Sequence, residues 1–205
     1  HIPREKNTEW FQVDGDASQR YFFVFTMRKG LTSEIEEKDY VLRDEQARAV
    51  AQTKAYFEKG GTEFLWNAKP RFGKTLTTYD LMRSMNLKKI LVVTNRPSIA
   101  NSWLADFRSF IEWRGNHLFV SETDALKDKD GVYSRDAFIA KQMDNENLGM
   151  VAFESLQGIK GSRYFGGDYD KLQWIADNEF DMLVIDEAHE GVDTIKTEHA
   201  FNNIR

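Results

Sequence analysis

The sequence predicts an α/β domain with a mostly parallel sheet flanked by helices. Short, β-branched apolar runs alternate with segments of helical periodicity, which is the pattern of strands joined by crossover helices. One apolar run leads into a loop that ends in Gly-Lys-Thr at residues 73–75, and another ends in two adjacent carboxylates at residues 186–187. Ligands bind at the carboxyl ends of strands in open α/β sheets, so we expect these two features to form one site.

The stretch from Phe64 to Thr75 predicts a short strand, a phosphate-binding loop and the start of a helix. Its end fits the pattern G-x-x-x-x-G-K-[ST], in which backbone N–H groups surround phosphate oxygens. The lysine of the pattern reaches the β- and γ-phosphates, the hydroxyl binds Mg²⁺, and the helix N-terminus favours the anion. Taken alone, Gly-Lys-Thr also fits an ordinary turn. The residues predicted to line the nucleotide are Ala68, Lys69, Pro70, Arg71, Phe72, Gly73, Lys74 and Thr75.

Two of these residues depart from the pattern. Ala68 replaces its first glycine, and Arg71 stands where such loops often carry another glycine. A side chain penalises positive φ, and Pro70 fixes its own φ near −65°. Either the loop keeps its usual curve with Arg71 at a permitted φ, or the empty loop collapses or opens. We predict the usual curve, with the Arg71 side chain directed outward.

The segment Met182-Leu-Val-Ile-Asp-Glu-Ala-His189 predicts a buried parallel strand that ends in two carboxylates. Asp186 could hold Mg²⁺ together with Thr75, and Glu187 could orient or deprotonate an attacking water. The alternative is an exposed acidic loop after a core strand. We expect Lys74, Asp186 and Glu187 to be the catalytic residues.

Asp186-Glu-Ala-His189 after such a loop resembles the DEAD/DEAH-box motors of helicase superfamily two. More narrowly, the chain resembles the motor subunits of type I and type III restriction enzymes, over about residues 40–199. The resemblance implies a RecA-like P-loop domain that binds ATP and Mg²⁺ and acts on DNA, expected to be double-stranded. It also implies that His189 couples the nucleotide site to movement, and that a second RecA-like domain supplies an arginine to the transition state.

The same resemblance places Arg43 and Gln46 near the adenine, because the motors carry Arg-x-x-Gln there. An amide can donate to and accept from the adenine edge at once. The alternative for Gln46 is a solvated first helical turn. We expect Asp44 to cap this helix, Gly60 to end it, and its apolar face to comprise Ala47, Val50, Ala51, Ala55 and Tyr56.

Four residues at predicted strand ends fall where the resembled motors contact nucleic acid. Thr94 ends the strand 90–94 and Arg96 lies in the turn that follows it, where Arg96 equally fits an ordinary crossover loop. Ser155 and Gln157 end the strand predicted at 149–157, and a mobile, Gly-rich basic segment is expected at 158–167.

The remaining elements complete the alternation. A further strand is expected at 117–120, and a solvated charged loop at 122–129. Helices are expected over 75–85, over 134–143, over 168–180, and after residue 98 or 101. The helix that follows residue 98 should bury one face, made of Trp103, Phe107 and Phe110.

Length and composition set the bounds of these predictions. The 205 residues suffice for one domain with an appendage: residues 1–39 as appendage and linker, and 40–205 as a first RecA-like ATPase domain, incomplete at its C-terminus. Residues 1–16 resemble the end of a GIY-YIG-like nuclease domain, or form a strand that packs on the motor. The chain has no cysteine and no membrane-length apolar run, so we expect a cytoplasmic protein. The net charge of −5 argues against nucleic-acid binding by bulk charge.

Together these features predict the ATP-binding motor domain of a restriction-type DNA helicase or translocase. This piece alone should be a poor ATPase without a second domain. One alternative is a nucleotide-gated DNA-binding module that does not translocate. The other is a P-loop phosphotransferase with a small substrate. Two features argue against it: the paired carboxylates and the lack of a lid-like arginine cluster.

Overall fold

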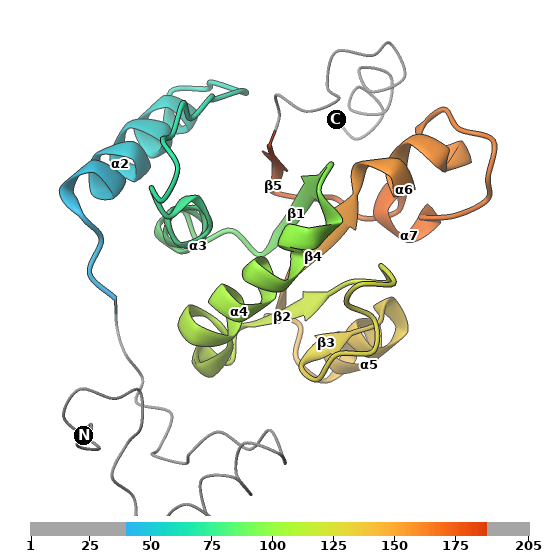
Figure 1. Cartoon of the computed structure of the whole chain (residues 1–205). Helices are drawn as coiled ribbons and strands as arrows, with labels where there is room; N and C mark the ends of the chain where they lie inside the picture. Colours follow the sequence, from blue (N-terminus) through green and yellow to red (C-terminus); the bar gives the residue numbers. More distant parts are fainter. Residues whose placement is uncertain (1–39, 188–205) are drawn as a thin grey trace, which may run out of the picture. The chain divides into compact units, whose positions relative to one another are not determined.

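A five-stranded, all-parallel sheet lies at the centre of residues 40–187, the part of the chain that the computed structural model describes (Figure 1). The strand order is β3-β2-β4-β1-β5. The predicted α/β architecture with a parallel sheet is therefore confirmed. The strands are β1 (Lys89–Thr94), β2 (His117–Val120), β3 (Val132–Tyr133), β4 (Gly149–Ser155) and β5 (Met182–Asp186).

Helices cover both faces of this sheet. The helix α2 packs on α3, and α3 and α4 share one apolar cluster, whereas α5, α6 and α7 contribute to the cluster on the other face. Within the described range, no helix combines the length and the apolar character needed to cross a membrane. The helices are α2 (Asp44–Glu58), α3 (Lys74–Ser84), α4 (Ala100–Phe110), α5 (Arg135–Asp144), α6 (Leu156–Gly161) and α7 (Gln173–Ala176), with 3₁₀ turns η1 (Pro97–Ile99), η2 (Glu112–Arg114) and η3 (Arg163–Phe165).

The strand β1 is buried because β4 and β5 pair with its two edges and helices cover both of its faces. Ile90 and Val92 belong to the cluster under α3 and α4, whereas Leu91 and Val93 belong to the opposite cluster. Burial of each such side chain contributes about 1.5–3 kcal/mol. This packing fixes the carboxyl end of β1, and with it the ends of its two neighbours.

The helix α4 buries the face that its periodicity predicts. Trp103 and Phe107 are almost fully buried, and Phe110 packs at the border of the same cluster. The ring of Tyr79, on α3, meets the ring of Trp103 edge-on, with 5.5 Å between the ring centroids. The two helices therefore pack through aromatic contacts.

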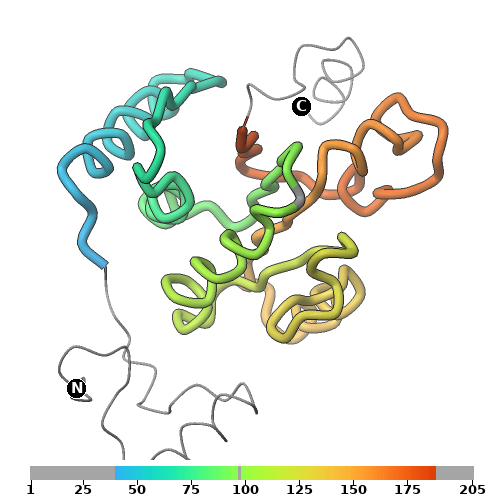
Figure 2. The backbone as a smooth tube through the Cα atoms, viewed as in Figure 1, coloured from blue at the N-terminus to red at the C-terminus, as the bar shows by residue number. Residues whose placement is uncertain are grey.

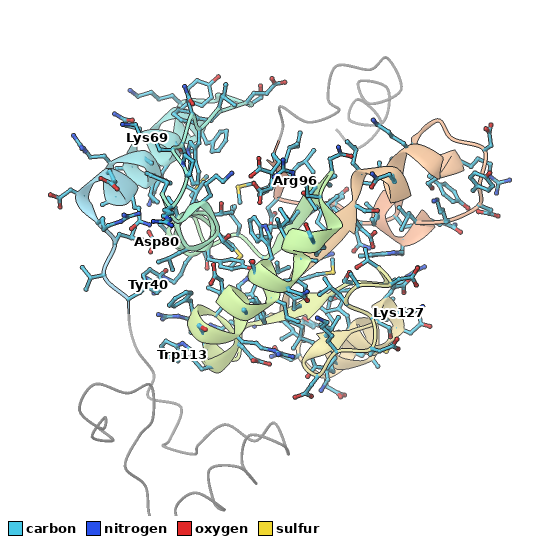
Figure 3. All side chains as sticks on the ribbon, in the orientation of Figure 1. Tyr40, Lys69, Asp80, Arg96, Trp113 and Lys127 are labelled. Carbon is cyan, nitrogen blue, oxygen red and sulfur yellow. The ribbon has the colours of Figure 1, made fainter. Side chains whose placement is uncertain are left out.

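A tyrosine anchors the start of the described chain to α3. The hydroxyl of Tyr40 donates to Oδ1 of Asp80 at 2.9 Å, and the Arg83 guanidinium lies over the Tyr40 ring at 5.1 Å (Figure 3). Burial and the hydrogen bond to Asp80 raise the pKa of Tyr40 above its ordinary value. The segment before α2 is therefore held against the helix that begins at the predicted phosphate loop.

The strand expected near Phe64 is absent from the structure. Residues 61–69 form neither helix nor strand and run from α2 towards α3 (Figure 2). The indole N–H of Trp66 donates to Oγ1 of Thr53 at 2.7 Å, and Phe64 meets Tyr56 edge-on. A strand needs a neighbour for its backbone hydrogen bonds. Within the described residues this segment packs its side chains on α2 instead.

The helix α2 differs from its prediction in cap and face. Arg43 is the N-cap and Asp44 is the first helical residue. Gln46 accounts for this shift, because its Oε1 accepts the Arg43 backbone N–H at 2.9 Å. The buried residues are Gln46, Val50 and Thr53, whereas Ala47, Ala51, Ala55 and Tyr56 are exposed. Gly60, with φ of +88°, follows the end of the helix as expected.

Three later segments also differ. The strand β4 ends at Ser155, whose Oγ accepts the Gly158 N–H at 3.0 Å and so starts α6; Gln157 is therefore helical and does not end a strand. Much of 158–167, expected to be mobile, is α6 and η3. Of the helix expected over 168–180, only the four residues of α7 are helical. This helix begins after Leu172, which has φ of +59°. The predictions for residues 1–39 and for His189 lie outside the described range.

Candidate functional site

The site lies where β1, β5 and α3 meet. Thr94, the last residue of β1, pairs in register with Asp186, the last residue of β5. Lys74 is the first residue of α3, and its Nζ lies 2.9 Å from Oε1 of Glu187 and 3.4 Å from Oδ1 of Asp186. The fold thus places one cation beside the two adjacent carboxylates.

The carboxylates set the charge of Lys74. Burial lowers the pKa of Lys74, but the hydrogen bond to Glu187 and the charges of Asp186 and Glu187 outweigh this effect, so the pKa lies above its ordinary value. Lys74 is therefore a fixed positive charge at neutral pH. Asp186 and Glu187 hold this charge at the start of α3.

The carboxylate of Asp186 is held at both oxygens. The indole N–H of Trp103 donates to Oδ2 at 2.9 Å, and the Glu187 backbone N–H donates to Oδ1 at 3.0 Å. Glu187 itself adopts φ of +58°, a left-handed conformation that is unfavourable for a side chain. This turn brings the Glu187 side chain back to Lys74.

Residues of α2 hold the loop before Lys74. The Gln46 Nε2 donates to the Phe72 carbonyl oxygen at 2.8 Å, and the Arg43 guanidinium donates to the carbonyl oxygens of Arg71 and Phe72. Both amide atoms of the buried Gln46 are therefore engaged within the protein. The structure places Arg43 and Gln46 against the loop, and their contact with adenine stays a prediction.

The loop turns through two left-handed residues. Gly73 has φ of +85°, and a Cβ there would lie 2.6 Å from Nε2 of Gln46, so only glycine fits without displacement. Arg71 has φ of +64°, which lies in the small left-handed region that residues other than glycine adopt only uncommonly. The Phe72 N–H, which donates to the Lys69 carbonyl at 3.1 Å, closes the tight turn that imposes this conformation. Arg71 is exposed, as are Lys69 and Pro70, while Ala68 and Phe72 are half-buried.

The residues of this site fit a nucleotide with Mg²⁺. An amine and the N-terminus of an eleven-residue helix offer positive charge to phosphate, and a carboxylate and a hydroxyl offer the oxygen ligands that Mg²⁺ prefers. Thr75 follows Lys74 at the start of α3 and is half-buried. No cluster of three or more acidic, histidine or cysteine ligands occurs among the described residues.

The predicted nucleic-acid residues lie at the same edge of the sheet. Arg96 and Gln157 are exposed, and Arg96 extends beyond the end of β1 (Figure 3). Gln157 donates to the side chain of Asn95 at 3.2 Å, which links α6 to the turn after β1. Thr94 is only 1% exposed, and its hydroxyl accepts the Arg96 N–H. Thr94 therefore shapes the turn, and its side chain is not at the surface.

The sequence patterns did not point to two residues of this region. Trp103 was assigned only to a buried helical face, although a buried indole N–H usually finds a partner, and that rule is the signal that could have found it. Glu154 is 2% exposed on β4, and its Oε1 has no hydrogen-bond partner among the described residues. A single glutamate within an apolar run signals little by itself.

This arrangement defines a class of protein: an α/β, RecA-like domain with a loop lysine facing carboxylates at the end of a neighbouring strand. The chain belongs to the family described as "Type III restriction enzyme, res subunit", which matches residues 39–205 and is a branch of helicase superfamily two. The resemblance drawn from the sequence is thereby confirmed.

A relative from Mycoplasma pneumoniae supports the same assignment. The chain is 32% identical over 166 residues to the protein named "Putative type II restriction enzyme and methyltransferase RM.MpnORF110P C-terminus". The match covers 78% of this chain and 21% of the relative. The chain therefore spans about a fifth of the length of the curated relative that it matches.

Proposed function

We propose that residues 40–205 are the first RecA-like ATPase domain of a DNA translocase or helicase of the restriction type. The observation that carries this proposal is the pairing of Lys74 with Glu187 and Asp186, which joins the Gly-Lys-Thr loop to the acidic strand end. The two motifs lie 113 residues apart in the chain and belong to one site in the fold. Family membership adds the expectation of an ATP-dependent motor.

Each residue of the site has a role that its chemistry supports. Lys74 leaves the carboxylates to neutralise charge on the β- and γ-phosphates of ATP. Thr75 and Asp186 would hold Mg²⁺, which when bound stabilises the charge that develops on the phosphates. Glu187, released from Lys74, orients or deprotonates the attacking water. The ion pair of the present structure thus holds the groups that ATP binding would separate.

Support for DNA as the partner comes from the edge of the sheet and from the family. Arg96 follows β1, and Ser155 and Gln157 lie at the junction of β4 and α6, so all three gather at the carboxyl ends of neighbouring strands. Arginine, hydroxyl and amide groups are the usual contacts to phosphate and sugar. We propose that they contact the DNA backbone, with Thr94 shaping the turn.

The proposal also covers how further domains would contribute to ATP hydrolysis. The match covers about a fifth of the relative's length, and we propose that this domain works together with a second RecA-like domain and a nuclease. In related NTPases an arginine from outside the P-loop domain accelerates turnover by roughly 10³–10⁵-fold. Without it, this domain should bind ATP and hydrolyse it slowly.

The experiment that tests the proposal separates binding from hydrolysis in the full-length protein. Glu187→Gln should keep ATP binding and lose hydrolysis, because an amide cannot accept a proton from water. Asp186→Asn should weaken Mg²⁺-dependent ATP binding as well. Equilibrium binding of a fluorescent ATP analogue and phosphate release measure the two steps. Equal losses of nucleotide affinity in both variants would refute these roles.

A further inference from the structure

We infer that Trp103 is a positioning residue for the Mg²⁺-binding carboxylate of Asp186. The inference rests on the proposed function, because it concerns how the site receives its metal. Its basis is the 2.9 Å hydrogen bond from the Trp103 indole N–H to Oδ2 of Asp186. Trp103 lies on α4, so a helix that carries none of the predicted nucleotide-binding residues reaches the centre of the site.

The indole is itself held in place. Trp103 is 1% exposed, and its ring meets the ring of the fully buried Tyr79 edge-on. The Tyr79 hydroxyl also donates to the Trp103 backbone carbonyl at 2.9 Å, and Tyr79 belongs to α3, the helix that begins at Lys74. The donor that faces Asp186 is therefore fixed by the packing of α3 against α4.

A fixed donor on one oxygen decides how the carboxylate faces. With Oδ2 held by Trp103, Oδ1 lies towards Lys74, at 3.4 Å from its Nζ. Partners of this kind fix the orientation of metal-binding carboxylates, and their loss typically weakens metal binding about 10–100-fold. Removal of the indole N–H should therefore raise the Mg²⁺ requirement without removing any ligand.

The test compares Trp103→Phe with Trp174→Phe in the full-length protein. Trp174→Phe is the control for the loss of a buried indole ring. Trp174 is 4% exposed and lies in the opposite core cluster, and its indole N–H has no partner among the described residues. The Mg²⁺ concentration for half-maximal binding of a fluorescent ATP analogue should rise about tenfold in Trp103→Phe. Binding in EDTA and the unfolding temperature should change no more than in Trp174→Phe.

The outcomes separate this inference from the proposed function. An unchanged Mg²⁺ requirement in Trp103→Phe, beside a raised requirement in Asp186→Asn, would overturn the role of Trp103 and leave the proposed function standing. An unchanged requirement in Asp186→Asn would refute the proposed metal site itself. If Trp174→Phe raises the Mg²⁺ requirement by the same amount, the effect of Trp103→Phe comes from core packing and not from the hydrogen bond to Asp186.

A second measurement keeps the inference testable if Trp103→Phe does not fold. In the full-length protein labelled with 5-fluorotryptophan, Asp186→Asn should shift one fluorine signal. Titration of the parent protein with Mg²⁺ and the ATP analogue should move that same signal, because the carboxylate it contacts gains a metal. A fluorine spectrum that neither change affects would overturn the inference.

Discussion

The side-chain nitrogen of Lys74 lies 2.9 Å from Oε1 of Glu187 and links the first turn of α3 to the end of β5. The same nitrogen is 3.4 Å from Asp186, so one cation offsets two carboxylates that would otherwise repel each other. A bound phosphate would compete for this cation. Under the proposed function, ATP binding would therefore release Glu187 from Lys74.

Loss of this cation should abolish ATP-dependent activity. We expect Lys74→Ala in the full-length protein to lower the ATP hydrolysis rate at least about 100-fold, the scale seen when one transition-state donor is removed. Circular dichroism should show that the domain still folds, because Lys74 is a half-exposed surface cation. Lys127→Ala is the matched control, since Lys127 pairs with nearby Asp124 on an exposed turn. Equal hydrolysis rates for Lys74→Ala and the parent would contradict the proposed function.

Substitution of Gly73 should destabilise the loop for two separable reasons. Gly73→Ala forces a Cβ into φ of +85°, at about 1–2 kcal/mol, and places it 2.6 Å from Nε2 of Gln46. Gly60→Ala is the matched control, because Gly60 has φ of +88° and open space around its Cβ position. Chemical denaturation should show a greater loss for Gly73→Ala. If Gly73→Ala costs as much stability in a Gln46→Ala background as it does in the parent, the close contact with Gln46 is not the cause of the difference.

Arg71 should be replaceable by glycine with a gain in stability. Arg71 adopts φ of +64°, which costs a non-glycine residue about 1 kcal/mol, and its side chain is exposed. Arg71→Gly should therefore raise the free energy of unfolding by up to about 1 kcal/mol, less the added entropy of the unfolded chain. Asn86→Gly, at φ of +54°, should gain less because asparagine tolerates this region.

The affinity for ATP reports where the Arg71 side chain points. If the guanidinium lies outside the phosphate site, as predicted from the sequence, Arg71→Gly should bind the ATP analogue as the parent does. A tenfold loss of affinity would show that Arg71 contacts the phosphates.

Glu154 should make stability depend on pH. Burial and the charge of Glu122 raise the pKa of Glu154 to about 8. Backbone hydrogen bonds from Ser155 and Glu122 and the charge of Lys171 lower this pKa, but by less. The folded protein thus keeps a proton on Glu154 that the unfolded chain releases above about pH 4.5. The stability that Glu154 contributes is fully present below about pH 4.5 and is lost as the pH rises through about 8.

A neutral side chain should remove this dependence. Between about pH 6 and pH 9, the free energy of unfolding of Glu154→Gln should fall less than that of the parent, by an amount on the order of 1 kcal/mol or more. Glu146→Gln, at an exposed position, serves as the control and should follow the parent. Parallel pH profiles for Glu154→Gln and the parent would show that the buried carboxyl does not titrate in this range.

Local periodicity was enough to predict elements whose environment is uniform. The strands β1, β2 and β5 and the helices α3, α4 and α5 lie where the sequence predicts them, because continuous apolar runs favour strands and α4 needs one apolar face. The strand β5 is only partly buried, and not buried as predicted, because it lies at the edge of the described sheet. The strand near Phe64 failed for the opposite reason, since its existence depends on a partner far along the chain. The face of α2 failed because Gln46 and Thr53 are buried through hydrogen bonds and not through apolarity.

The sequence by itself determined the class of protein, the family and the residue types of the site. A Gly-Lys-Thr loop and a strand ending in Asp-Glu have few other uses together, so their chemistry could be inferred from spacing and composition. Only the tertiary structure decided which partners those residues have. Lys74 meets Glu187 across 113 residues, Gln46 meets the loop backbone, and Trp103 meets Asp186 across 83 residues. Contacts between residues so far apart arise from the packing of helices against the sheet, which no local pattern encodes.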